Sequence, residues 1–303
     1  MVKQTIAVVG LGQCSLDILG SLDQYPAVDS KCDLNSALIQ GGGPVATALV
    51  TLARLGVVSA FVGRIGGDDF GSRIGRGLQD EGVDCRHLLI DDGAGSQFAF
   101  IAVEQGGGRR TIFCHRGSCR FLRVEELPTD LIRNSRLLHL DGSHLEAALA
   151  AARQAKETGV ITVLDGGSWR PGIEELLPLI DHQVVSARFA EHLLPGGSLQ
   201  EVLPLLLAYG GLAATVTDGE AGSHTLTQDG RSFYQPAFAV KAVDTTGCGD
   251  VFHGGYLYGL LKNWPLRRTV RFAAACAAIK ATALGGRTAI PTLTKVEALL
   301  AAG

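Results

Sequence analysis

Between residues 137 and 217 the chain alternates regularly between short apolar runs and longer amphipathic segments. The apolar runs predict β-strands over 137–140, 160–165, 183–186 and 213–217. The segments between them predict helices over 145–157, 173–179 and 199–209. Strands that alternate with helices form a parallel sheet with helices on both faces, because each parallel connection must cross over the sheet. This order predicts an α/β fold whose ligands bind beyond the carboxyl ends of the strands, where Asp141, Asp165 and Thr217 stand.

The N-terminal part of the chain predicts further strands and helices. We expect strands over 5–9 and 57–62, and helices over 45–55 and 72–81. A β-hairpin is expected over 96–115, because residues 96–104 alternate, a glycine-rich turn follows, and 110–115 return. Its aromatic side chains are expected to form a core under the hairpin, and the alternative is a platform for stacking; they are Phe98, Phe100 and Phe113.

The first predicted strand leads into half of a dinucleotide-binding fingerprint. Gly10 and Gly12 are present, but Ser15 stands where the third glycine belongs. Residues 16–29 also lack the apolar periodicity of a long crossover helix. A Rossmann nucleotide site is therefore not favoured here.

The heptapeptide 244–250 reads Asp-Thr-Thr-Gly-Cys-Gly-Asp and leads into an apolar segment that predicts a helix. Glycines at 247 and 249 let backbone amides turn inward, and amides at a helix N-terminus attract an anion such as phosphate. Asp250 then falls in the first helical turn, where a carboxylate can take a proton from an incoming hydroxyl. The alternative for a Gly-x-Gly-Asp string by itself is a turn with an Asp that caps a helix.

The full string resembles the Asp-Thr-x-Gly-x-Gly-Asp signature of the ribokinase, or pfkB, family of sugar kinases. The resemblance implies that Asp250 is the catalytic base and that Gly247, Cys248 and Gly249 form the anion hole. It implies a ribokinase-like three-layer α/β sandwich, with a mostly parallel sheet and helices on both faces. It also implies a single domain over 1–303, with a small β-sheet lid built from segments near 13–40 and 95–118.

The same resemblance implies a set of sugar-binding residues. Asp17 matches the Asp that holds sugar hydroxyls, a task that suits a carboxylate because it accepts two hydrogen bonds from a diol. The run Gly41, Gly42 and Gly43 matches the glycines that lie against the substrate, although Ala46 stands where most members carry Asn.

On the nucleotide side, the turn of 217–222 resembles the family's Thr-x-Gly-x-x-Gly. The contacts implied for ATP are Thr217, Gly219, Gly222, Thr246 and Gly286. Mg²⁺ accompanies ATP because it neutralises the transferring phosphate, but the family's Asn-x-x-Glu is missing near 186–189. In relatives the first Asp of the signature, here Asp244, can hold a monovalent cation such as K⁺, and the alternative is a helix-start cap.

The segments 41–47, 163–166, 235–238, 251–254 and 285–287 together look most like those of the sulfofructose-kinase branch of the family. That branch binds an anionic tail on its ketose. Lys31 is a candidate donor to such a tail. However, Asp141 and Cys114 stand where two further donors are expected, and an unpaired buried sulfonate is unfavourable. We therefore expect a neutral or weakly anionic ketose or sugar acid as acceptor, with sulfofructose a poor one.

Two rival functions remain open. One is a nucleoside kinase of the same family, with Phe98 or Phe113 stacking on a base. The other is a non-catalytic sugar or nucleotide sensor, suggested by the missing Asn-x-x-Glu, although a sensor has no use for Asp250. The chain has no Gly-x-x-x-x-Gly-Lys-Ser/Thr, which excludes a P-loop enzyme as far as motifs can.

Composition limits the partners and the compartment. A net charge of −3 gives no reason to expect nucleic acid or a membrane as partner. Seven cysteines without a Cys-x-x-Cys pair favour a reducing cytoplasm. Cys248 is expected to be the most reactive of them, because a helix N-terminus favours the thiolate. The family resemblance implies a homodimer that forms through the lid.

Overall fold

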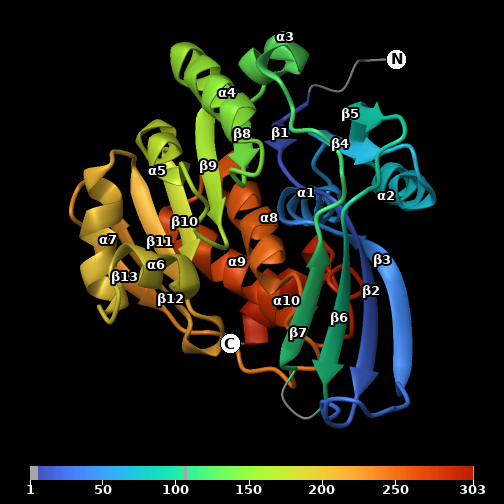
Figure 1. Ribbon diagram of the computed structural model, residues 1–303. Helices are drawn as coiled ribbons and strands as arrows, with labels where there is room; N and C mark the ends of the chain where they lie inside the picture. The colour runs from blue at the N-terminus through green and yellow to red at the C-terminus, as the bar shows by residue number, and fades with distance from the viewer. Residues whose placement is uncertain (1–5, 106–107, 303) are drawn as a thin grey trace.

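The computed structural model describes residues 6–105 and 108–302. The strands of its larger sheet are β1 (Val8–Leu11), β4 (Ser59–Gly66), β5 (Asp84–Asp91), β8 (Leu137–Leu140), β9 (Ile161–Gly166), β10 (His182–Ser186), β11 (Ala213–Thr217), β12 (Ser223–Thr227) and β13 (Ser232–Gln235). Their order across the sheet is β13-β12-β11-β10-β9-β8-β1-β4-β5 (Figure 1). All neighbours pair in parallel except β12 and β13, which add an antiparallel hairpin at one edge.

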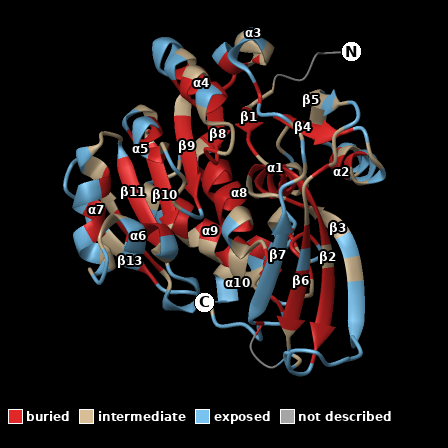
Figure 2. Cartoon of the chain, in the orientation of Figure 1, coloured by how far each residue is buried: buried red, intermediate tan, exposed pale blue. Residues whose placement is uncertain are grey.

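Helices cover both faces of this sheet because successive residues of each buried strand point to opposite sides. Val184 belongs to one apolar cluster and its neighbour Val185 to the other. The first cluster includes α1 (Pro44–Arg54), α2 (Asp69–Asp80), α8 (Cys248–Leu261), α9 (Leu266–Lys280) and α10 (Leu293–Ala302). The second includes α3 (Thr129–Arg133), α4 (Leu145–Thr158), α5 (Ile173–Leu176), α6 (Ala187–Leu193) and α7 (Leu199–Ala208). Figure 2 shows the buried strands between these two layers.

A second, smaller sheet stands beside the main one and forms the lid (Figure 1). Its strands are β2 (Ser15–Leu22), β3 (Ser36–Gly42), β6 (Phe98–Glu104) and β7 (Arg110–His115), in the order β3-β2-β6-β7. β2 and β6 pair in parallel, and the two outer pairs are antiparallel. The expected mostly parallel sheet with helices on both faces and a small second sheet is confirmed.

The lid aromatic residues correct one expectation. The expectation that Phe100 and Phe113 belong to a core under the hairpin is wrong, because these side chains are 37% and 49% exposed. They pair across β6 and β7 on the outward face, with ring centroids 6.0 Å apart. Phe98 is half-buried and stacks on His115 at 5.0 Å.

Several elements were not expected from the sequence. Residues 16–29 begin with the lid strand β2, whose apolar side chains face both the main domain and the outer surface, so no helical period appears. The edge strand β5 and the hairpin of β12 and β13 are only partly buried, so their apolar signal is weak. The helix α9 begins after Pro265 and ends at Lys280. Within the described residues, none of the helices combines the length and apolar composition needed to cross a membrane.

Candidate active site

The signature 244–250 forms the entry to α8. Gly247 is the N-cap residue with φ 74°, a conformation that favours glycine, and a Cβ there would meet the backbone of Gly286. At Gly249, by contrast, no heavy atom lies within 4 Å of the position that a Cβ would take. The helix N-terminus therefore has open space beside Gly249, where the backbone amides of a helix start favour an anion. One of these amides, that of Cys248, also donates to the carbonyl oxygen of Thr245 at 3.3 Å.

Asp250 lies in the first turn of α8. Burial and, after it, the negative charge of Asp165 raise the pKa of its carboxyl to about 7, and His253 opposes this shift. The negative charge of Asp17, which is far away in sequence, also raises the pKa of Asp250. A carboxyl group with a pKa near neutrality is well suited to take up a proton.

A buried pair of side chains, His253 and Asp165, acts on the pKa of Asp250. Nδ1 of His253 lies 3.3 Å from Oδ2 of Asp165 and 2.8 Å from the carbonyl oxygen of Gly249. Its Nε2 lies 3.2 Å from the carbonyl oxygen of Val184 on β10. Sequence reasoning placed Asp165 only at a strand end and missed His253. The available signal was the spacing of three residues from Asp250, which brings both side chains to one face of a helix.

Asp17 lies at the lid side of the site. Its Oδ1 accepts a hydrogen bond from Ser15 Oγ at 2.8 Å, and burial raises the pKa of its carboxyl. The carboxylate packs on Gly42, where a Cβ would overlap it, so that glycine is required by close approach. Gly43 caps α1 with φ 93°. The structure thus brings Asp17 and the glycine run together.

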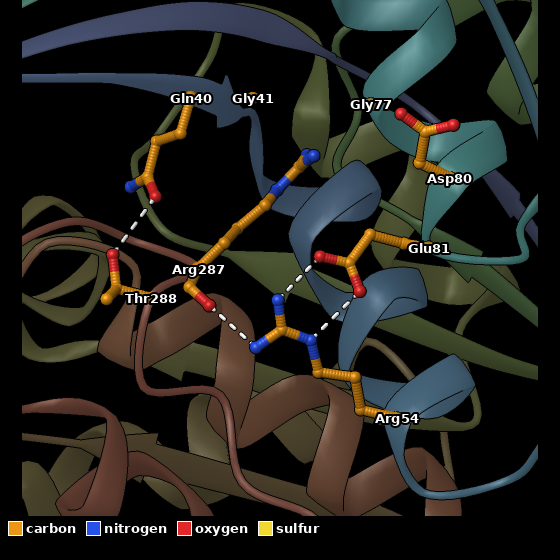
Figure 3. A pocket seen from close by; sticks show the side chains of 8 residues that line it. All are labelled: Gln40, Gly41, Arg54, Gly77, Asp80, Glu81, Arg287 and Thr288. Atoms are coloured by element: carbon orange, nitrogen blue, oxygen red, sulfur yellow. Dashed lines mark hydrogen bonds and ion pairs between the residues drawn. The ribbon is translucent and has the colours of Figure 1, made fainter.

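Arg287 supports this glycine run from below (Figure 3). The residue is 5% exposed, and its guanidinium donates to Gly42 O at 3.0 Å and to Thr47 Oγ1 at 3.2 Å. A Cβ at Gly41 would overlap the guanidinium. A cavity of about 480 Å³ lies next to Gly41 and Arg287. Its lining residues are Gln40, Gly41, Arg54, Gly77, Asp80, Glu81, Arg287 and Thr288. Sequence reasoning did not identify Arg287.

Asp244 connects the signature to the closing loop. Its Oδ1 accepts from the backbone N–H of Thr246 and its Oδ2 from that of Gly285, both at 2.7 Å. Its backbone carbonyl accepts from Lys280 Nζ at 2.6 Å. Thr246 Oγ1 is buried and has no hydrogen-bond partner among the described residues, so it remains available for a ligand.

The lid touches the signature through Arg110, which sequence reasoning also missed. Arg110 Nη1 donates to Thr245 Oγ1 at 2.6 Å, and that hydroxyl donates to the carbonyl of Gly108 at 3.0 Å. The guanidinium lowers the pKa of Asp250, although less than the neighbours raise it. This positive charge therefore acts on Asp250, the expected base.

The remaining predicted residues fall in three places. Thr217 ends β11, and Gly219 and Gly222 form the turn to β12 with φ 51° and 84°. Lys31 is exposed in the loop between β2 and β3, and the structure does not bring it to Asp17. For Cys248, burial raises the pKa of the thiol, which counts against the expected thiolate.

The residues where the Asn-x-x-Glu was sought form the start of α6. Ser186 Oγ accepts from the N–H of Phe189 as a helix cap. Glu191 is engaged by the N–H of Gly196 at 3.1 Å. Among the described residues no group of three His, Cys, Asp or Glu side chains converges to hold a metal ion.

A larger cleft of about 860 Å³ lies between the lid and the carboxyl ends of β1, β4, β8 and β9. Four arginines line it: Arg64, Arg116, Arg120 and Arg170. Arg64 and Arg120 share Glu126 as ion-pair partner at 2.7 and 2.9 Å. Arg116 and Arg170 have no carboxylate partner among the described residues, and Arg170 donates to Gln13 Oε1 at 3.2 Å.

Comparison with known proteins assigns the chain to a family. The profile of the pfkB family carbohydrate kinases matches residues 7–293. Fructokinase-2 of Oryza sativa subsp. japonica is 33% identical over 284 residues, 86% of this chain and 84% of that protein. The ATP-dependent ribose-1-phosphate kinase of Halopiger xanaduensis is 28% identical over 304 residues, 97% of this chain and 98% of that protein.

A solved structure agrees with these sequences. Ribokinase from Thermotoga maritima superposes with a TM-score of 0.85 at 25% identity, and the match covers 98% of this chain and 99% of that one. The similarities confirm the ribokinase-like fold and a carbohydrate kinase, whereas the sulfofructose-kinase branch stays a prediction. The chain belongs to the pfkB family of carbohydrate kinases.

Proposed function

We propose that the protein transfers the γ-phosphoryl group of ATP to a hydroxyl of a small sugar or sugar acid. The observation that carries this proposal is the position of Asp250. It stands in the first turn of α8, next to residues 247–249 with open space beside Gly249, and burial with Asp165 raises its pKa to about 7. Base and anion hole are thus adjacent, as an in-line phosphoryl transfer requires.

In the proposed reaction the acceptor hydroxyl lies between Asp17 and Asp250. The hydroxyl oxygen attacks the γ-phosphorus, the bond to the bridging oxygen of ADP breaks, and the proton passes to Asp250. The amides of 247–249 stabilise the charge that develops on the phosphoryl oxygens. Thr246, Gly286 and the turn of 217–222 are proposed to hold the nucleotide. Mg²⁺ enters with ATP and neutralises its phosphates.

The arginines in the larger cleft favour an anionic acceptor. Arg116 and Arg170 line that cleft without carboxylate partners among the described residues, and arginine binds carboxylate and phosphate in a bidentate manner. A relative named for ribose 1-phosphate indicates that this scaffold accepts an anionic acceptor. We therefore favour a sugar acid or another anionic sugar over a neutral ketose. The expectation that sulfofructose is a poor acceptor was based on missing donors at Asp141 and Cys114, and Arg116 and Arg170 in this cleft count against that reasoning. Sulfofructose therefore belongs in the panel of acceptors to be tested.

A nucleoside is a weaker candidate. Asp17 pairs across the lid with Ala99, and Ala99 pairs with Cys114, so these three side chains share one face. Phe98 and Phe113 occupy the alternate positions and point to the other face, away from Asp17. Their position counts against stacking on a base held at Asp17.

The decisive experiment measures ADP release with a panel of neutral sugars, sugar acids, sugar phosphates and nucleosides. We expect turnover with a sugar or sugar acid. Asp250→Asn should retain ATP binding and lose turnover by roughly 10²- to 10⁴-fold, the usual contribution of a general base. Turnover of this variant within threefold of wild type would contradict the assignment of the base, and binding without turnover in the wild type would favour a sensor.

We also propose a homodimer that forms through the outward face of the lid. Ile39, Ile18, Phe100 and Phe113 follow one another across all four strands in a single row. Three of them are 50%, 37% and 49% exposed in the monomer, namely Ile39, Phe100 and Phe113. A continuous apolar row is typical of an interaction surface. A cytoplasmic location is proposed as well, supported by seven free cysteines.

A further inference from the structure

Lys280 is a fully buried lysine next to the signature loop. It is the last residue of α9, it is 0% exposed, and its Nζ donates to the backbone carbonyl of Asp244 at 2.6 Å. Burying an ammonium group is unfavourable unless opposite charges and hydrogen bonds compensate. The ammonium group of a lysine at such a position therefore needs nearby negative charge, or its positive charge has a function at the neighbouring loop.

The charged groups around this ammonium lie in the proposed catalytic loop and on the lid strand β7. The carboxylates of Asp244 and Asp250 stabilise it, Arg110 opposes it, and burial lowers its pKa overall. Lys280 also lowers the pKa of Cys248, the first residue of α8, although burial dominates there. The ammonium thus lies close to the residues that open the anion hole.

The same place was expected to hold a monovalent cation, and the residues present do not fit one. All three oxygens of Asp244 already accept hydrogen bonds from protein donors, namely Thr246 N–H, Gly285 N–H and Lys280 Nζ. A metal cation needs free oxygen ligands, and here it would lie beside a positive charge that Lys280 already supplies.

We propose that Lys280 is a built-in cation that replaces a bound monovalent ion and positions the anion-hole loop. Its ammonium fixes the carbonyl of Asp244 and offsets the Asp244 carboxylate, so that the loop 244–250 presents a positive potential to phosphate. Lys280 is a positioning residue, because it acts through the loop. The proposal rests on the proposed anion hole at 247–249 and adds that nucleotide binding and turnover are independent of K⁺.

The test compares K⁺, Na⁺ and choline salts at equal ionic strength. For the wild type we expect the same ATP dissociation constant, thermal midpoint and kcat in all three. Lys280→Ala, which removes the charge and leaves room for an ion, should bind ATP about tenfold more weakly in choline and recover in K⁺ or methylammonium. Lys280→Arg keeps the charge and should stay near wild type. Lys295→Met is the matched control, since Lys295 is exposed on α10.

The outcomes separate this proposal from the assignment of function. Wild-type ATP binding that requires K⁺ would overturn it, and so would a Lys280→Ala variant that is unaffected or that no cation rescues. If Lys280→Ala does not fold, Lys280→Met, which keeps the bulk, replaces it. ATP affinity and its K⁺ dependence need no sugar, so they decide the role of Lys280 even if the proposed acceptor is wrong.

Discussion

His253 Nδ1 and Asp165 Oδ2 lie 3.3 Å apart, and both groups act on the pKa of Asp250. The two residues come from α8 and from the carboxyl end of β9. Asp165 is 5% exposed, and its charge is, after burial, the main cause that raises the pKa of Asp250 to about 7. The buried pair therefore controls the pH at which the proposed base is ready to accept a proton.

This arrangement predicts a pH profile. Asp250 must be ionised to take the acceptor proton, so kcat/KM should rise with pH through about 7, the pKa of its carboxyl in the folded protein. Asp165→Asn removes the neighbouring negative charge and should move this rise to lower pH. Steady-state kinetics across pH would measure the shift. Asp229→Asn serves as the control, because Asp229 lies in the exposed turn between β12 and β13. A profile unchanged by Asp165→Asn would contradict the coupling.

The free energy of unfolding should change with pH for the same reason. A raised folded-state pKa of Asp250 stabilises the fold below the ordinary pKa of an Asp, 3.8, and this contribution is lost as pH rises to about 7. Asp250→Asn should therefore gain stability relative to wild type at pH 8 more than at pH 4. Urea unfolding at the two pH values measures the difference, and an equal effect at both would contradict the raised pKa.

Cysteine reactivity should follow exposure rather than the helix N-terminus. Burial raises the pKa of Cys248, which makes its thiolate scarce at neutral pH. Cys32 and Cys114 are exposed, so alkylation should modify them first. Peptide mapping after partial reaction would show the order. Early modification of Cys248 with loss of activity, prevented by ATP, would instead favour an activated thiolate at the helix N-terminus.

The sequence predicted the parts of the site that lie in one contiguous segment. The string 244–250 carries the glycines, the proposed base and the start of α8 together, so local rules were enough to place these residues side by side. Lys280, Arg287 and His253 act through residues far away in the chain, and their types alone indicate ordinary core or surface positions. Only folding brings Lys280 to Asp244 across 36 residues and Arg287 to Gly42 across 245.

The same distinction holds for the fold. The regular alternation after residue 137 predicted parallel strands correctly, because each of these strands is buried on both faces. Periodicity alone did not predict the lid strand β2, since its pairing with β3 and β6 depends on segments elsewhere in the chain; only the family resemblance implied a lid segment within 13–40. Residues of edge strands such as β5 are only partly buried, so the sequence shows a weak apolar periodicity there.

The lid surface predicts an oligomer. Phe113→Glu places a charge in the outward row, where it faces Phe100 at a centroid distance of 6.0 Å in the native pair. We expect this variant to elute as a monomer in size-exclusion chromatography with light scattering, whereas the wild type elutes as a dimer. Tyr234→Glu is the control, an exposed aromatic residue on β13 outside the lid. A wild-type monomer, or a Phe113→Glu dimer, would contradict the lid interface.

The arginines of the larger cleft predict which acceptor the enzyme prefers. Arg170 is half-buried and its Nη2 donates to Gln13 Oε1 at 3.2 Å, so its guanidinium is held in place with donors left over. Arg170→Gln should raise KM for a sugar acid by roughly tenfold or more, because a charge-assisted hydrogen bond contributes about 1.5–3 kcal/mol. KM for a neutral sugar should change little, since it has no group that needs this charge.

Arg120 offers the comparison for this prediction within the same cleft. Its guanidinium is already engaged by Glu126 at 2.9 Å and by Asp91 at 3.6 Å, and it is 48% exposed as a side chain. Arg120→Gln should therefore change KM for a sugar acid less than Arg170→Gln does, because its charge is largely neutralised within the protein. Steady-state kinetics with one neutral and one acidic acceptor for each variant separates the two roles. An equal increase in KM for both acceptors would mean that Arg170 contributes to the shape of the cleft but does not bind the anionic group of the acceptor. The proposed preference for an anionic sugar would then be wrong.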